Sequence, residues 1–321
     1  MPSVTKFASS VCLAVLALVS GPAPAGTGTR SPQPAQGQAQ APRFTGGTEA
    51  VLVDVLVTRA SQTVPDLKAA DFTVLDSGVE QKVELLAIES LPVSLLLALD
   101  TSASVRGPAL EHLKAAAKAA VASLRPADEA ALVTFAHNVA LGAGWTNDRA
   151  QLNQAIDAVV AQGSTALADA AFTTLGLRGK GRTRTLVLFF TDGDDTASWL
   201  NAADVVDAAR QSDAVVYGIT LPTPGSVITP SDDLEKRLRS EPRLYRGALL
   251  PILARETGGE SLRATDTQNL SAVFVDAVSR FNTRYVLSYA PTGVPASGWH
   301  PIEVRVSASG VDVRTRRGYV R

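Results

Sequence analysis

The chain has 321 residues, of which 45% are hydrophobic and 19% are charged, so it can bury a core and is neither fibrous nor wholly disordered. A chain of this length predicts about two domains. Its 30 basic and 31 acidic side chains leave a net charge of −1, which provides no overall field to attract nucleic acid or an anionic membrane. We therefore expect no nucleic-acid partner.

The first residues have the features of an export signal. Lys6 supplies a positive charge, residues 7–19 are largely apolar, and Ala23-Pro24-Ala25 offers small residues for cleavage. We expect residues 1–25 to be a signal peptide of an exported protein that is periplasmic, secreted or associated with the cell surface. The apolar run is shorter than the roughly 20 residues that cross a bilayer, and no later run is longer, so we expect no transmembrane segment in the mature chain. Cys12 is the only cysteine, and the mature protein would therefore contain none.

The next segments predict a linker followed by strands. Residues 26–43 are rich in Pro, Gln and Ala with no large aliphatic side chain, which is typical of a flexible linker. Alternating valines from Val51 to Val57 predict a strand. Two further strands are expected at Phe72–Leu75 and Gln81–Ile88, joined by a tight turn at Asp76-Ser77-Gly78. We expect residues 44–91 to be the N-terminal strands of a small β-sandwich.

Residues 92–282 show short apolar runs that alternate with helical patterns. This alternation predicts an α/β domain with a doubly wound, mostly parallel sheet and helices on both faces. The expected strands are Val93–Leu99, Ala131–Phe135, Val139–Leu141, Leu186–Phe190, Ala214–Ile219 and a weaker Glu260–Arg263. The expected helices are Ala109–Ser123, Arg149–Ala161, Ala166–Leu177, Ala202–Gln211, Leu249–Glu256 and Gln268–Arg280.

Residues 283–321 return to a strand pattern. Strands are expected at Tyr285–Tyr289, Ile302–Val306 and Val311–Thr315. A few strands bury little apolar surface by themselves. We therefore expect the two terminal sets to form one β-sandwich, with the α/β domain inserted between them.

Polar residues follow three of the predicted elements of the α/β domain. Asp100, Ser102 and Ser104 come at the end of its first strand, Thr165 precedes a helix, and Asp192 follows the run Leu186–Phe190. In an open parallel sheet these positions share the edge at which ligands bind. Each residue alone is more often a helix cap or part of a polar turn. Together they indicate a metal site.

The donor set of these residues favours Mg²⁺. Three hydroxyls can act as direct ligands, while Asp100 and Asp192 can hold coordinated waters, which suits an octahedral ion that keeps part of its water shell. Mn²⁺ and Ca²⁺ are the alternatives. Neutral hydroxyls leave the charge of the ion largely uncompensated, so an open position would attract an Asp or Glu of a protein partner.

At these residues the chain resembles the von Willebrand factor type A family. Its metal-ion-dependent adhesion site reads D-x-S-x-S, then a distant Thr, then an Asp within T-D-G, and all of these positions are filled by the residues given above. The resemblance covers roughly residues 92–281 and implies a von Willebrand A-like fold and a non-enzymatic protein-binding module for adhesion or complex assembly. Segments 71–78, 284–289 and 317–319 are similar to those of a bacterial exported subgroup of this family.

Two other functions remain open from the sequence. A Mg²⁺-dependent phosphohydrolase could use Asp100 as its nucleophile, although position 102 is Ser where such an enzyme would carry an acid. The chain could also be a structural scaffold whose metal site no longer functions. The sequence contains neither a G-x-S-x-G nucleophile elbow nor a G-x-x-x-x-G-K-[ST] phosphate loop.

Two charged regions have competing interpretations. Asp194 and Asp195 are expected to be solvated or to cap a helix, rather than to bind the metal. The segment Thr229–Arg246 carries mixed charge and is either a solvated helix or loop, or a partner surface. The sequence indicates no oligomeric state.

Overall fold

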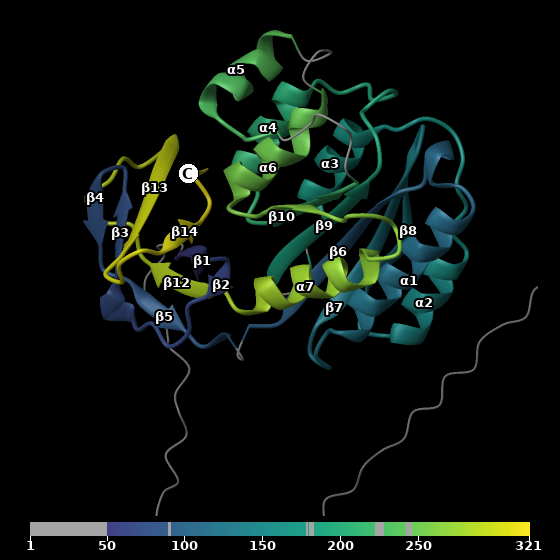
Figure 1. Ribbon diagram of the computed structural model, residues 1–321. Helices are drawn as coiled ribbons and strands as arrows, with labels where there is room; N and C mark the ends of the chain where they lie inside the picture. The colour runs from purple at the N-terminus through teal and green to yellow at the C-terminus, as the bar shows by residue number, and fades with distance from the viewer. Residues whose placement is uncertain (1–49, 89–90, 178, 180–182, 222–227, 242–245) are drawn as a thin grey trace, which may run out of the picture. The chain divides into compact units, whose positions relative to one another are not determined.

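The computed structural model describes residues 50–88, 91–177, 179, 183–221, 228–241 and 246–321 (Figure 1). The predicted signal peptide and linker lie outside these residues. The described residues belong to one compact unit, Gly47–Arg321.

Its strands are β1 Val51–Arg59, β2 Gln62–Thr63, β3 Phe72–Asp76, β4 Val79–Gln81, β5 Glu84–Leu86, β6 Val93–Asp100, β7 Glu129–Phe135, β8 Val139–Thr146, β9 Arg184–Thr191, β10 Val215–Thr220, β11 Ser261–Arg263, β12 Tyr285–Tyr289, β13 Trp299–Val306, β14 Asp312–Arg314 and β15 Gly318–Val320. Its α-helices are α1 Pro108–Ala122, α2 Arg149–Asp157, α3 Leu167–Gly176, α4 Ala202–Gln211, α5 Asp232–Ser240, α6 Leu249–Thr257 and α7 Leu270–Asn282.

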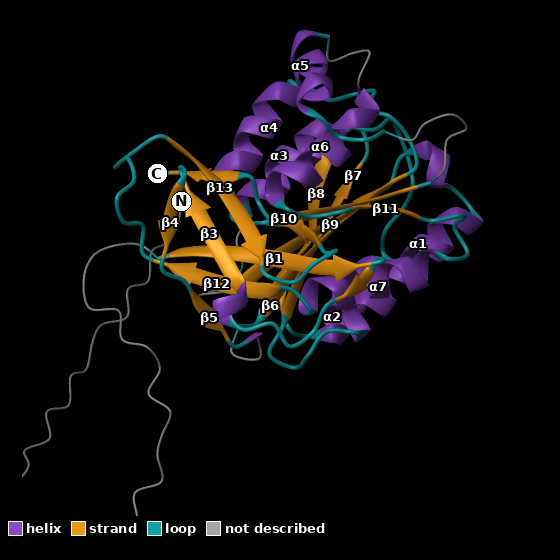
Figure 2. Cartoon of the chain, turned by 60° about the vertical axis from the view of Figure 1, so that its left-hand side comes forward, coloured by secondary structure: helices purple, strands orange, loops and turns teal. Residues whose placement is uncertain are grey.

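The α/β domain is built on a six-stranded sheet in the order β11-β10-β9-β6-β7-β8. All neighbouring strands are parallel except β7 and β8, which are antiparallel. Every residue of β6 is buried, as expected for a strand of a parallel sheet that is covered on both faces. Figure 2 shows helices on both sides of this sheet. The predicted doubly wound fold is therefore confirmed.

Alternation along β6 divides the core into two layers. Leu95 and Leu97 pack on one face with residues of α1, α2 and α7. Leu96 and Ala98 pack on the other face with residues of α3, α4 and α6. Because successive strand side chains point to opposite faces, one continuous apolar run serves both layers.

The ends of most elements of this domain lie within two residues of the prediction, and the largest differences are in β8 and α2. β8 continues to Thr146 instead of ending at Leu141, and it pairs with β7 through two register irregularities. Only one residue of this edge strand is buried, so the apolar alternation that signals a strand is weak there. Helix α2 ends at Asp157 instead of Ala161.

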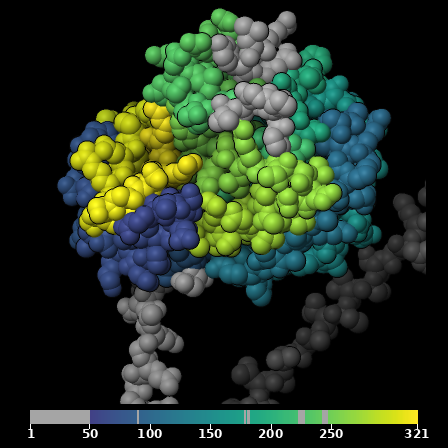
Figure 3. Space-filling view, viewed as in Figure 1, coloured from purple at the N-terminus to yellow at the C-terminus, as the bar shows by residue number. Residues whose placement is uncertain are grey.

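The terminal strands form the predicted β-sandwich. One sheet has the order β14-β1-β12-β5, with β2 paired to β1, and the other has the order β15-β13-β3-β4. Each sheet therefore contains strands from both ends of the chain. In Figure 3 the blue-purple N-terminal surface lies directly against the yellow C-terminal surface. Residues of both sheets, including Val53, Leu287, Phe72 and Val304, share one apolar core.

The expected strand Gln81–Ile88 was wrong as a single element. Val79–Gln81 (β4) pairs with β3, whereas Glu84–Leu86 (β5) pairs with β12 in the opposite sheet. The predicted tight turn is present, with positive φ angles of 51° at Ser77 and 81° at Gly78. The buried Gln81 side chain donates from Nε2 to the carbonyl oxygen of Thr292 and accepts the backbone N–H of Thr292 at Oε1. These two hydrogen bonds hold the chain where it leaves β4. A short fourth C-terminal strand, β15, was not predicted.

Buried arginines join the sandwich to the α/β domain. Arg184, the first residue of β9, donates from Nε to Oδ1 of Asp54 at 2.8 Å, and its guanidinium lies 4.4 Å from the ring centroid of Phe281. Arg284 donates to the carbonyl oxygen of Gly258 at 2.5 Å. The sandwich therefore contacts the amino end of β9. The carboxyl end of this eight-residue strand lies about 23 Å from its amino end, so these arginine contacts do not reach it.

Candidate functional site

The predicted site lies where β6 and β9 end. These adjacent parallel strands finish at Asp100 and Thr191. From the central strand β6 the chain first builds β7 and β8 on one side, and later β9, β10 and β11 on the other. The carboxyl ends of β6 and β9 therefore flank the point at which the strand order reverses, which is the usual ligand position in such sheets.

Hydrogen bonds connect four of the predicted metal residues. The carboxylate of Asp100 is fully buried and accepts the backbone N–H of Ser102 at 2.9 Å. The hydroxyl oxygens of Ser102 and Ser104 are 3.0 Å apart. Ser104 then donates to Oδ1 of Asp192 at 2.8 Å. The structure thus brings these oxygen atoms together across two strands.

The fifth residue, Thr165, lies beside this group on a separate loop. The backbone of that loop is bonded to the segment after β6, from Gln162 N–H to Thr101 O at 2.7 Å and from Ala103 N–H to Gly163 O at 2.9 Å. Gly163 has a φ of 80°, and a Cβ there would lie only 2.4 Å from the imidazole of His137. Glycine is therefore required for this close approach.

Thr191 is a positioning residue that the sequence interpretation did not assign. Its hydroxyl donates to Oδ2 of Asp100 at 2.6 Å, so both carboxylate oxygens of Asp100 are held. The signal was present in the sequence, because Thr191 is the first residue of the T-D-G motif. Its neutral hydroxyl at the end of a buried strand gave no separate reason to select it.

Helix capping does not explain the predicted metal residues. The first turn of α3 is capped from another loop, with Ala168 N–H donating to Asp195 at 2.9 Å and to Ser198 at 3.0 Å. The N-cap residue of α3 is Ala166, not Thr165. Within the described residues, Ser102 makes no side-chain capping bond to the short 3₁₀ helix that follows it. Asp195 caps a helix, as expected for the Asp194-Asp195 pair, and the helix that it caps is α3. The following helix, α4, is capped by Asn201.

The electrostatics of the site favour a bound cation. Burial raises the pKa of Asp100, hydrogen bonds from Thr191 and Ser102 oppose this shift, and the nearby charge of Asp192 adds to it. Two carboxylates close to one another are stabilised in their charged form by a cation between them. The described residues contain no cluster of three or more His, Cys, Asp or Glu side chains suited to a metal. Hydroxyl oxygens would therefore have to complete the ligand set, and such an all-oxygen set fits a hard divalent ion.

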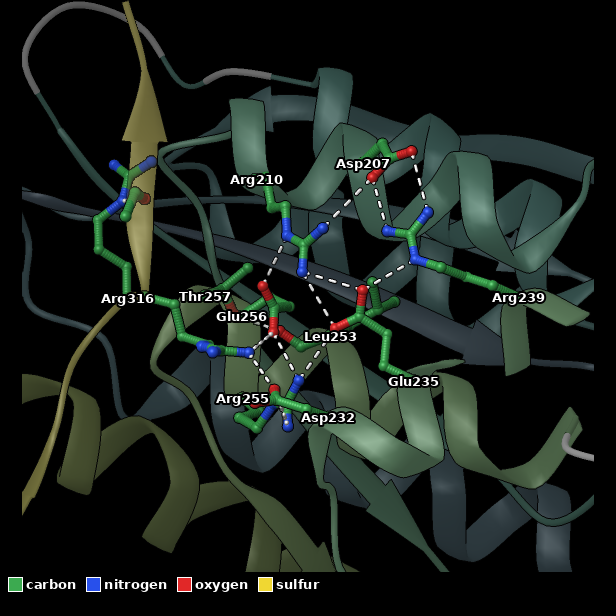
Figure 4. Close-up of polar contacts among 12 residues, drawn as sticks. Asp207, Arg210, Asp232, Glu235, Arg239, Leu253, Arg255, Glu256, Thr257 and Arg316 are labelled. Atoms are coloured by element: carbon green, nitrogen blue, oxygen red, sulfur yellow. Dashed lines mark hydrogen bonds and ion pairs between the residues drawn. The ribbon is translucent and has the colours of Figure 1, made fainter. Parts of the chain in front are cut away.

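The charged segment Thr229–Arg246 contains α5, which packs on the domain through ion pairs (Figure 4). Glu235 is only 6% exposed and accepts hydrogen bonds from Arg210, Arg239 and Arg255. Arg210 also donates to the buried Glu256 at 2.8 Å. The inner face of α5 is therefore committed to α4 and α6, while Asp233 and Arg237 remain on its exposed face.

Besides His137, the chain has two histidines, and both have partners within the fold. His300 is fully buried, and its Nδ1 lies 3.0 Å from Oδ1 of Asp76 inside the sandwich. His112 on α1 lies 2.9 Å from the hydroxyl of Thr267. The contact between His300 and Asp76 joins strands β13 and β3 of the sandwich and is no part of the sheet edge at which β6 and β9 end. Among the described residues, no helix combines the length and apolar character needed to cross a membrane.

Residues 95–194 match the family model described as von Willebrand factor type A domain. No curated protein matches the sequence. Among solved structures, the chain is similar to conserved hypothetical protein BatB from Bacteroides thetaiotaomicron, with 16% identity over 59% of this chain and 98% of that chain and a TM-score of 0.44. It is similar to proximal thread matrix protein 1 from the mussel byssus with a zinc-occupied MIDAS motif, with 17% identity over 64% of this chain and 49% of that chain and a TM-score of 0.49. A third similar structure is von Willebrand factor type A from Catenulispora acidiphila, with 12% identity over 86% of this chain and 75% of that chain and a TM-score of 0.45.

Proposed function

We propose that this chain, which contains a von Willebrand factor type A domain, is an exported, non-enzymatic protein-binding module for adhesion or complex assembly. It recognises an acidic group of its partner at a Mg²⁺-occupied metal-ion-dependent adhesion site. The observation that carries this proposal is the set of hydrogen bonds from Asp100 through Ser102 and Ser104 to Asp192. This set lies at the sheet edge where ligands of such folds bind.

Each residue of the site has a distinct role in this proposal. Ser102, Ser104 and Thr165 would contribute neutral oxygen ligands, while Asp100 and Asp192 would hold coordinated waters. Thr191 keeps the Asp100 carboxylate in place through its 2.6 Å hydrogen bond. When bound, Mg²⁺ would supply an electrophilic position for a partner carboxylate, with Mn²⁺ or Ca²⁺ as alternatives.

The burial of Asp100 supports a binding role over phosphoryl transfer. A carboxylate nucleophile must be able to reach a phosphorus atom. Asp100 is fully buried, and each of its oxygens accepts a hydrogen bond, from Ser102 N–H and from the hydroxyl of Thr191. The neighbouring position that would carry a general acid is Ser102.

The experiment is capture of partners on the immobilised mature chain, with Mg²⁺ and with chelator. Capture of proteins or acidic peptides should require Mg²⁺ and should be lost in Thr165→Ala, because this variant removes one oxygen ligand. The matched control is Ser164→Ala, which removes the hydroxyl of an exposed neighbour and should leave capture unchanged. Capture that survives both chelator and Thr165→Ala would contradict the proposal. Turnover of a generic phosphoester would support the phosphohydrolase, and the absence of both activities would support a scaffold.

A further inference from the structure

Trp199 places a large apolar side chain in water close to the proposed site. It lies between β9 and α4, and it is 94% exposed. Among the described residues, it is the most exposed large hydrophobic side chain. Tryptophan is unfavourable in this position in a free protein, and it is enriched among the residues that dominate binding energy at interfaces.

The backbone around Trp199 is held in place by side chains of the chain itself. Both carboxylate oxygens of Asp169 accept the N–H of Trp199 at 3.1 Å, and one also accepts the N–H of Leu200 at 2.9 Å. Asp195 accepts the N–H of Ser198 at 3.1 Å. A backbone fixed in this way loses little conformational entropy when a partner binds.

This loop is bonded directly to the proposed metal loop. Thr196 N–H donates to Thr165 O at 2.8 Å, and Thr165 N–H donates to the hydroxyl of Thr196 at 3.1 Å. Trp199 is three positions after Thr196, so its backbone lies within about 10 Å of that of Thr196, the residue bonded to Thr165. A single partner segment can therefore reach both places.

A hollow of about 390 Å³ lies beside the indole. It is lined by apolar side chains of three helices, α3, α4 and α6. Its lining includes Ala168, Asp195, Trp199, Leu200, Ala202 and Leu249. This volume is large enough for one aromatic or branched aliphatic side chain.

The polar groups around the hollow disfavour an anionic occupant. The backbone N–H groups of residues 196–200 all donate within the chain, to Thr165, Asp195 and Asp169. They are therefore not free to bind an anion. Asp195 lines the hollow, so a second acidic group of the partner would be repelled.

We infer that this hollow binds an apolar side chain of the same partner segment whose Asp or Glu reaches the metal site. Trp199 is the residue that selects this side chain. The inference rests on the proposed function, because the acidic residue fixes the segment in place. An extended segment rises about 3.3 Å per residue, so the apolar residue should lie about two to four positions from the acid.

The test uses an array of nine-residue peptides and the mature full-length chain. Each peptide has a central Asp in a Gly-Ser background and one variable position, occupied by Leu, Phe, Trp, Lys, Glu or Ser. Binding is measured in Mg²⁺ and in chelator. Peptides with Leu, Phe or Trp about two to four positions from the Asp should bind at least about tenfold more tightly than the Ser peptide, as expected for a buried aromatic contact.

Two variants separate this inference from the proposed function. Trp199→Ala should remove the apolar preference while Mg²⁺-dependent binding of the Ser peptide persists. Trp299→Ala is the matched control, because it removes an indole that is 40% exposed on β13 of the sandwich and should preserve the preference.

The outcomes are distinct. A preference for Lys, or an apolar preference that survives Trp199→Ala, would overturn the inference and leave the metal-dependent function standing. The absence of Mg²⁺-dependent binding to every peptide would overturn both.

Discussion

Ser104 donates its hydroxyl hydrogen to Oδ1 of Asp192 at 2.8 Å, although the two residues are 88 positions apart in the sequence. The contact exists because β6 and β9 are adjacent parallel strands that end at the same edge of the sheet. It places the neutral hydroxyl oxygen of Ser104 next to the charged carboxylate of Asp192. The sheet itself therefore positions the groups that we propose to bind the cation.

Mg²⁺ should stabilise the folded chain against heat. A ligand that binds only the folded state adds about 2.7 kcal/mol when its concentration is 100 times the dissociation constant. Thermal denaturation should therefore shift to higher temperature in Mg²⁺ or Mn²⁺, and the shift should vanish in Asp100→Ala. The control is Asp194→Asn, which neutralises an exposed carboxylate outside the proposed site and should keep the shift. Identical melting curves in metal and in chelator would rule out the site.

Metal affinity should decrease in acid earlier than for an ordinary aspartate site. Burial and the charge of Asp192 raise the pKa of Asp100, so this carboxylate takes up a proton at a higher pH than usual. The metal requires the charged form, and affinity should therefore decrease about tenfold per pH unit below that pKa. Calorimetric titration with Mn²⁺ from pH 4 to pH 8 measures this dependence. An affinity that stays constant down to about pH 4 would contradict it.

The same raised pKa predicts that Asp100 destabilises the metal-free protein at neutral pH. The stabilising contribution of the protonated group is complete below the unfolded-state pKa and is lost as the pH rises through the folded-state pKa. In chelator at pH 7, Asp100→Asn should therefore leave the free energy of unfolding unchanged or increase it. Denaturant titration of both proteins provides the measurement. A large loss of stability in Asp100→Asn would show that the charge of Asp100 is needed for the fold itself.

Asp76 should be essential to the sandwich. Its carboxylate is fully buried and accepts hydrogen bonds from Tyr289 and Tyr319 at 3.0 and 2.8 Å, so it links the N-terminal strand β3 to the C-terminal strands. Asp76→Asn should lower the free energy of unfolding by about 2 to 4 kcal/mol, because buried donors lose a charged acceptor. The control is Glu303→Gln on β13, an exposed carboxylate, which should change stability by less than about 0.5 kcal/mol.

The contribution of Asp76 should also set part of the acid stability. Burial opposes its ionisation, but hydrogen bonds from Tyr319, His300, Tyr289 and Ser77 outweigh burial and lower its pKa. A lowered folded-state pKa gives stability that is present above the unfolded-state pKa of about 3.9 and is lost as the pH falls through the folded-state value. In Asp76→Asn, the free energy of unfolding should therefore decrease less steeply in acid than it does in the wild type. If the wild type and the variant show the same pH dependence below pH 4, Asp76 does not contribute in this way.

Glu235 should hold α5 on the domain. This carboxylate is 6% exposed and accepts from three arginines, so Glu235→Gln should cost about 3 kcal/mol by removing a buried negative charge that the three guanidinium groups share. Hydrogen exchange should increase in α5 first. The neighbouring Asp233→Asn, on the exposed face, serves as the comparison and should have little effect. Unchanged exchange in α5 after Glu235→Gln would contradict this role of the ion pairs.

Several features of this protein follow from the sequence alone. Apolar runs such as Val93–Leu99, interrupted only by Ser94, indicate parallel strands covered on both faces, because both sets of alternating side chains must be buried. The order of helical and strand patterns predicts the inserted α/β domain. The positions of Asp100, Ser102, Ser104, Thr165 and Asp192 predict a common sheet edge, since parallel strands share the direction in which they end.

Other features depend on contacts between distant residues, and local patterns do not encode them. The run Gln81–Ile88 has the composition of one strand, but hydrogen bonding divides it between two sheets. The charges of α5 are typical of a solvated surface, yet Glu235 is buried because arginines of α4 and α6 neutralise it. His300 and Asp76 are 224 positions apart, and only the antiparallel pairing of β3 with β13 brings them into contact. Burial and pairing are properties of the assembled fold, and for these residues only the tertiary structure decides them.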